Sequence, residues 1–216
     1  MDVTTFYTIG SFTFPSSWAA IIVAFIVAYI AIRIWYGKQH AVRLADAFFY
    51  VIIVWKLSVV LLDFKMILRA PLGIVYFNGG IAGFVLSLLF VMVKTWIDWH
   101  KGKLAHGGIE AMLVGSFIAQ SVFQVIVVLL NKGSLSLFLL TIMLFTASLI
   151  YIIKGLRKTS RIPLIWLFVA VHLFLSAFMP QGLHNFSLHV TVMIAVFFSF
   201  LIWNEERKLK IKGESF

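Results

Sequence analysis

Long apolar segments alternate with short links that hold most of the charged residues. A helix needs about 20 mostly apolar residues to cross the hydrocarbon core of a bilayer, and seven segments qualify. The pattern therefore predicts an all-α polytopic membrane protein with seven transmembrane helices. The expected spans are residues 18–34, 46–62, 72–93, 109–130, 135–153, 162–178 and 188–203.

The links between these segments are too short for a soluble domain. We therefore expect one seven-helix membrane domain over residues 18–204. A short extracytoplasmic segment, residues 1–17, precedes it, and a basic cytoplasmic tail, residues 205–216, follows it.

The distribution of lysine and arginine predicts the orientation. Of the 18 such residues, 14 fall in links on one side of the predicted membrane and three on the other, while Lys56 lies within a span. Because cytoplasmic links carry the excess of basic residues, the N-terminus is expected outside and the C-terminus in the cytoplasm. This pattern suits a multi-pass protein of a bacterial plasma membrane.

Composition excludes several classes of protein. Apolar residues make up 62% of the chain and charged residues only 12%, whereas soluble domains average about 45–50% and about 25%. Soluble, disordered and nucleic-acid-binding proteins are therefore excluded, the last despite a net charge of +10. The chain has no cysteine, which excludes disulfides and thiolate chemistry. We expect no cofactor.

Polar groups inside the predicted spans are the candidate functional residues, because burying them in hydrocarbon costs free energy. Lys56 could extend toward the membrane surface, pair with Asp63, or hold a lipid phosphate. The Asn78-Gly79-Gly80 sequence allows a close backbone approach to another helix or to a ligand.

Two further spans carry polar side chains. Gln120 and Gln124 share one face of the fourth span with Ser116, where they either bond neighbouring helices or line a cavity. His172, one turn before Ser176, is either a hydrogen-bonded interior residue or an acid or base. His184, His189 and Asp63 fall near the outer face, but their spacing matches no metal-ligand pattern, so no metal site is expected.

Several local patterns, in chain order, resemble those of the prolipoprotein diacylglyceryl transferase family. They are residues 6–12 around Ile9-Gly10 with Trp18 after them, Asp46 through Trp55-Lys56-Leu57, Pro71-Leu72 before Asn78-Gly79-Gly80, and the fifth and sixth spans. The likeness covers about residues 6–205. It implies seven spans with the N-terminus outside, and an enzyme that moves diacylglycerol from phosphatidylglycerol onto a lipoprotein precursor.

The departures from the family fall on its chemistry. The family's essential His precedes a second Gly-Gly pair, but here there is one pair, so Asn78 or Phe84 takes that position and neither is a base. Gln120 stands nearest the family's fourth-span Arg, and the sixth-span Arg and Glu become His172 and Ser176. Stabilising a departing phosphate needs fixed cations or donors, so the resemblance implies a retained scaffold without the standard reaction.

We therefore expect a protein that binds a phosphatidylglycerol-like phospholipid, or an acylated or membrane-protein partner. The expected lipid-binding residues are Lys56, Asn78, Gly79, Gly80, Gln120, Gln124 and His172. Two alternatives stay open. One is an active diacylglyceryl or acyl transferase with a rearranged site and His172 as its candidate catalytic residue. The other is an accessory subunit or small-solute transporter.

Overall fold

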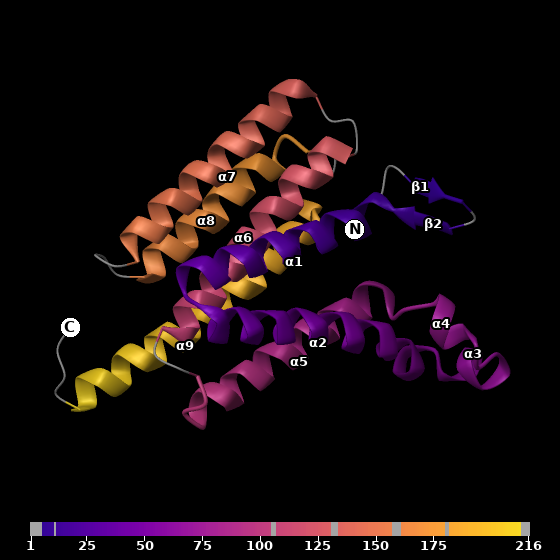
Figure 1. The fold of residues 1–216 in the computed structure, drawn as a ribbon, viewed down its shortest axis with the longest axis horizontal. Coiled ribbons are helices and arrows are strands. Elements are labelled where there is room, and N and C mark those ends of the chain that lie inside the picture. The colour runs from indigo at the N-terminus through magenta and orange to yellow at the C-terminus, as the bar shows by residue number, and fades with distance from the viewer. Residues whose placement is uncertain are drawn as a thin grey trace.

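The computed structural model describes residues 6–10, 12–104, 107–130, 134–156, 161–179 and 182–212 (Figure 1). Long helices run back and forth and pack side by side. The long helices are α1 (Ser16–Trp35), α2 (Lys38–Leu62), α5 (Gly80–His100), α6 (Gly108–Leu130), α7 (Leu135–Gly155), α8 (Arg161–Ser176) and α9 (Phe186–Lys212). Between α2 and α5 lie two short helices, α3 (Phe64–Arg69) and α4 (Gly73–Tyr76).

Six of the described helices are long and apolar enough to cross a membrane: α1, α2, α5, α6, α7 and α9. The chain is therefore a multi-pass helical membrane protein. The expectation of seven such helices is wrong for the predicted span at 162–178. That segment forms α8, whose 16 residues extend about 24 Å and end in turns from Ala177 onward.

The predicted span at 72–93 also differs, because its helix begins only at Gly80. The Asn78 side-chain oxygen accepts a hydrogen bond from the Gly80 N–H at 2.9 Å, a local turn that asparagine favours. Gly80 has a φ of +59°, which L side chains rarely adopt. The residues before it form the separate helix α4, so the third crossing starts later than the apolar pattern indicates.

The expectation of an all-helical membrane domain is confirmed, and the segment before α1 is a short hairpin. Strands β1 (Phe6–Ile9) and β2 (Phe12–Pro15) pair antiparallel, with Phe6 opposite Pro15. The Tyr7 hydroxyl donates to the Leu130 carbonyl oxygen at 3.1 Å. This contact ties the hairpin to the last residue of α6. We call this end of the bundle the hairpin end.

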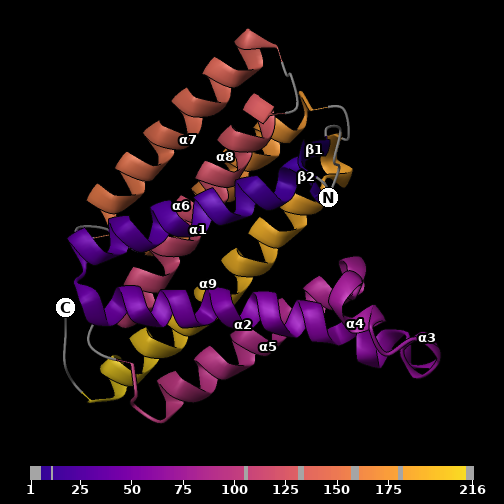
Figure 2. The same cartoon turned by 45° about the vertical axis from the view of Figure 1, so that its right-hand side comes forward.

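Helix α6 is the centre of the bundle, and more than half of its apolar span is buried, the largest share among the candidate spans. It packs against α1, α2, α7 and α9, and Figure 2 shows it enclosed between them. Phe117 of α6 stacks on Phe168 of α8 with ring centroids 4.1 Å apart, and Phe145 of α7 joins them. These aromatic rings join three helices in one core.

Helices α2 and α5 form a pair at one side of the bundle (Figure 1). Their close approach depends on Gly79 and Gly83. A Cβ atom added at Gly79 would lie 1.9 Å from the Ser58 Oγ, and one at Gly83 would lie 2.0 Å from it. The Gly79 N–H also donates to the Trp55 carbonyl oxygen at 3.2 Å. Small residues permit this approach where lipid leaves no hydrophobic force between helices.

We predict that Gly83→Ala destabilises the protein in detergent by about 1–3 kcal/mol, because the added methyl group overpacks the α2–α5 contact. Thermal unfolding of the purified protein measures this. The double variant Ser58→Gly with Gly83→Ala removes the Ser58 side chain that the added methyl group would meet, so it should restore most of the stability. Equal unfolding temperatures for Gly83→Ala and the unchanged protein would contradict this packing account.

Candidate functional site: an apolar cavity with an amide end

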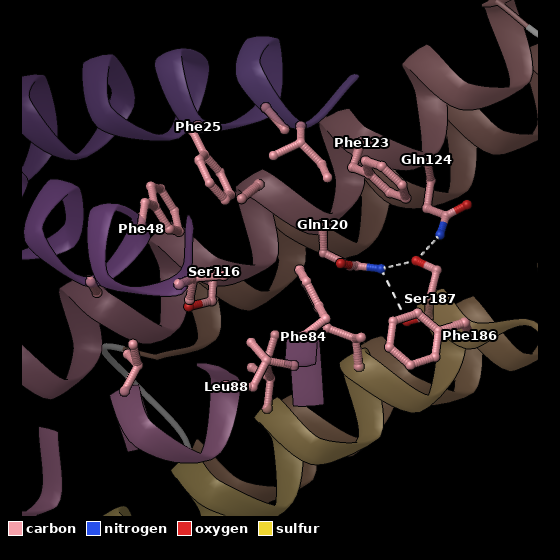
Figure 3. Close-up of a pocket in the computed structure, with 18 of the residues that line it drawn as sticks. Phe25, Phe48, Phe84, Leu88, Ser116, Gln120, Phe123, Gln124, Phe186 and Ser187 are labelled. Atoms are coloured by element: carbon pink, nitrogen blue, oxygen red, sulfur yellow. Dashed lines mark hydrogen bonds between the residues drawn. The ribbon is translucent and has the colours of Figure 1, made fainter. Parts of the chain in front are cut away.

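A cavity of about 310 Å³ lies inside the bundle. Residues of α1, α2, α5, α6 and α9 line it, and almost all of the lining atoms are apolar. Figure 3 shows Phe25, Phe48, Phe84, Leu88 and Phe123 around it. The lining residues that the structure describes include no Lys, Arg, His, Asp or Glu. A mostly apolar cavity of this size with a few polar groups is typical of a ligand site.

Four polar residues lie at the hairpin end of this cavity, which we call the amide end (Gln120, Gln124, Asn185 and Ser187). The Gln120 Nε2 donates to the Ser187 carbonyl oxygen at 3.2 Å, and also to the Ser187 hydroxyl. The Gln124 Nε2 donates to the same hydroxyl (Figure 3). The Asn185 side-chain oxygen accepts the Ser187 N–H at 2.9 Å, so Asn185 caps α9 and fixes Ser187 opposite the two amides.

The cavity separates α5 from α9. Helix α5 packs on α2, while α9 packs on α6 and α8, so residues of α5 and α9 face each other across the space. Near the amide end the rings of Phe84 and Phe186 meet edge to face, with centroids 5.7 Å apart. On this side of the cavity, α5 and α9 are therefore in contact through side chains, and their backbones do not pack closely.

The other end of the cavity adjoins a charged end, where Arg43, Lys94 and Asp98 line a smaller space of about 40 Å³. The two spaces share lining residues, Thr95 and Met112 among them. Lys94 lies 2.8 Å from the Asp98 carboxylate and Arg43 lies 4.0 Å from it. Arg43 also donates to the Lys103 carbonyl oxygen. These contacts connect α2, α5 and the link that follows α5.

The structure brings together Gln120 and Gln124 among the expected site residues, and Ser116 lines the same cavity. Lys56 is half-buried on α2 and does not line the cavity. Asn78 starts α5 through its own local turn, while Gly79 packs against Ser58 and Gly80 accepts a hydrogen bond from the Trp55 indole at 2.8 Å. In the described structure these residues organise the α2–α5 contact.

His172 is fully buried between helices and does not line the cavity. Its Nδ1 lies 2.7 Å from the Thr191 hydroxyl oxygen. That hydroxyl also donates to the Ser187 carbonyl oxygen at 3.2 Å. The chain of hydrogen bonds thus joins α8 to α9 behind the amide end, where it holds Ser187 in place.

Ser187 is the residue that sequence reasoning missed. It lies one position before the expected span at 188–203, so the apolar pattern places it in a link. The available signal was Asn185 two residues earlier, because an asparagine before an apolar run is a helix N-cap pattern. Lys94 and Asp98, four residues apart, were likewise available as a charge pair on one helix face.

Comparisons with protein-family models, with curated proteins and with solved structures found no match to this chain.

We predict that Ser187→Ala destabilises the protein by about 1–3 kcal/mol, because the nitrogens of two buried amides lose a hydroxyl acceptor. Ser199→Ala is the matched control in the same helix. The Ser199 hydroxyl is buried and has no hydrogen-bond partner among the described residues, so its removal should be neutral or stabilising. Thermal unfolding of both variants in detergent measures the difference, and equal destabilisation would contradict the assigned bonds.

Proposed function

We propose that the protein is a lipid-binding membrane protein that holds one acyl chain of a bilayer lipid in the cavity. The observation that carries this proposal is the cavity itself: about 310 Å³ of space inside a membrane bundle, lined almost wholly by apolar atoms. An acyl chain loses little by leaving the bilayer for such a space, because both surroundings are hydrocarbon-like. The amide end supplies the few polar contacts that would fix its position.

The expected phosphatidylglycerol-like lipid fits this proposal only with its phosphate outside the cavity. No cationic side chain is among the described lining residues, and an unpaired charge is expensive to bury. We infer that the chain enters sideways from the bilayer between α5 and α9. An acylated membrane partner could present its chain by the same route.

Binding is favoured over catalysis by the position of His172. A catalytic base must come within hydrogen-bond reach of the group on which it acts, but His172 bonds Thr191 and is absent from the described lining. We therefore propose that the chain is related in fold to the prolipoprotein diacylglyceryl transferase family but does not carry out its transfer reaction.

We also propose that the chain lies in a bacterial plasma membrane with its N-terminus outside, and that the short helix α8 is a seventh crossing. Helix α8 packs against both α7 and α9, and its apolar sequence suits hydrocarbon. A span a few ångström shorter than the bilayer core is accommodated by local thinning at modest cost.

We predict the following labelling pattern for single cysteines introduced into this cysteine-free chain. Lys65→Cys and Leu183→Cys should react with an impermeant maleimide on intact cells, and Lys101→Cys only after permeabilisation. All three positions are exposed. Because α8 separates Leu183 from the preceding basic link, labelling of Leu183→Cys only after permeabilisation would contradict seven crossings.

We predict that Ala119→Phe lowers lipid occupancy about tenfold, because the ring fills part of the cavity from α6, where Ala119 is buried in its lining. A tenfold change corresponds to about 1.4 kcal/mol. Native mass spectrometry in mild detergent counts the lipids retained per protein. Ala147→Phe, at an exposed position of α7 away from the cavity, is the control and should retain lipid normally. Unchanged lipid occupancy in a folded Ala119→Phe variant would contradict the proposal.

A further inference from the structure

The amide end holds two glutamine side chains whose oxygens have no hydrogen-bond partner among the described residues. Gln120 is 8% exposed and Gln124 is 1% exposed. Both side-chain nitrogens donate to Ser187, and no donor among the described residues reaches either side-chain oxygen. Figure 3 shows the Gln120 oxygen turned away from Ser187, toward the side on which Ser116 and Phe25 lie. An amide oxygen in the lining of an apolar cavity has few other partners, so a ligand that brings a donor gains a hydrogen bond at this position.

The charge of the lining restricts which donor this can be. The described lining residues carry no cation and no anion. A phosphate or carboxylate at the amide end would be desolvated without a partner and would place its oxygens against amide oxygens. An ammonium group would likewise find no carboxylate there. The chemistry left is an uncharged head group with a hydrogen-bond donor, such as a hydroxyl.

The charged end does not offer an equivalent place for an anionic head group. Lys94 and Arg43 both face the single carboxylate of Asp98, and Arg43 also donates to the Lys103 backbone. Lys94 lies over the Tyr50 ring, 5.2 Å from its centroid. An anion at this end would have to compete with contacts that already engage both cations.

We propose that the cavity selects an uncharged acyl lipid with a hydroxyl-bearing head group, of which a monoacylglycerol is the simplest example. A hydroxyl of the head donates to the Gln120 oxygen at the amide end. The acyl chain runs from there past Leu88 toward Thr95, along the apolar lining. This inference rests on the proposed function and adds to it the chemical class of the head group.

The test compares three probes that share one oleoyl chain and differ in the head: 1-monooleoylglycerol, oleoyl lysophosphatidylglycerol and methyl oleate. Each is titrated against the full-length protein in detergent, and native mass spectrometry counts the bound probe. We expect monooleoylglycerol to bind about tenfold more tightly than either other probe, as one hydrogen bond to an amide oxygen of the lining would give. Equal or tighter binding of the lysophosphatidylglycerol would overturn the inference.

The Gln120→Leu variant locates the head group. It should lose about tenfold in affinity for monooleoylglycerol while its affinity for methyl oleate stays the same, since methyl oleate has no hydroxyl. Retained binding of methyl oleate also reports that the cavity is intact. Gln39→Leu, the same change at an exposed position of α2, is the control and should change neither affinity. Unchanged monooleoylglycerol binding in Gln120→Leu would overturn the assignment to the amide end.

The outcomes separate this inference from the proposed function. If the three probes bind equally, the cavity takes acyl chains without selecting the head group, and only the inference fails. If none of the three binds, the proposed function fails as well. Should Gln120→Leu not fold, the comparison of the three probes on the unchanged protein still decides between these outcomes.

Discussion

The cost of leaving hydrogen-bonding groups unpaired in hydrocarbon is the constraint on which the rest of this structure depends. Helices satisfy their own backbone groups, and several polar side chains inside the bundle pair with one another. Ser187 receives both glutamine amides, and His172 reaches the same helix through Thr191. These bonds fix α6, α8 and α9 relative to one another. The helix pair α2–α5 is held separately, by the glycine contacts at Ser58.

The cavity lies between these two separately held groups of helices. Helices α5 and α9 belong to differently packed groups, and the space between them is lined by side chains that cannot fill it. A mostly apolar cavity of about 310 Å³ falls in the size range of ligand sites in proteins, and this supports the proposed lipid site. Its mostly apolar lining and the amides at one end suit the proposed lipid chain with one hydrogen-bonding group.

The apolar periodicity was enough to predict a multi-pass helical protein and to place most of its helices, because hydrocarbon admits few alternatives. It did not predict the late start of α5, which depends on the turn at Asn78 and the positive φ of Gly80, or the 16-residue length of α8. Gln120 and Gln124 were identified by their cost in a membrane. Ser187 was not, because its role depends on a contact with a residue more than sixty positions away, which no local pattern reveals.

The most direct test of lipid binding in this cavity is to map where a lipid lies. A phospholipid with a photoreactive group near the end of one acyl chain would be reconstituted with the protein and cross-linked, and the modified residues identified by mass spectrometry. The account predicts adducts on cavity residues such as Leu88, Phe123 and Phe197. Adducts confined to exposed outward residues such as Leu139 and Phe174 would mean that lipid only surrounds the bundle, and would contradict the account.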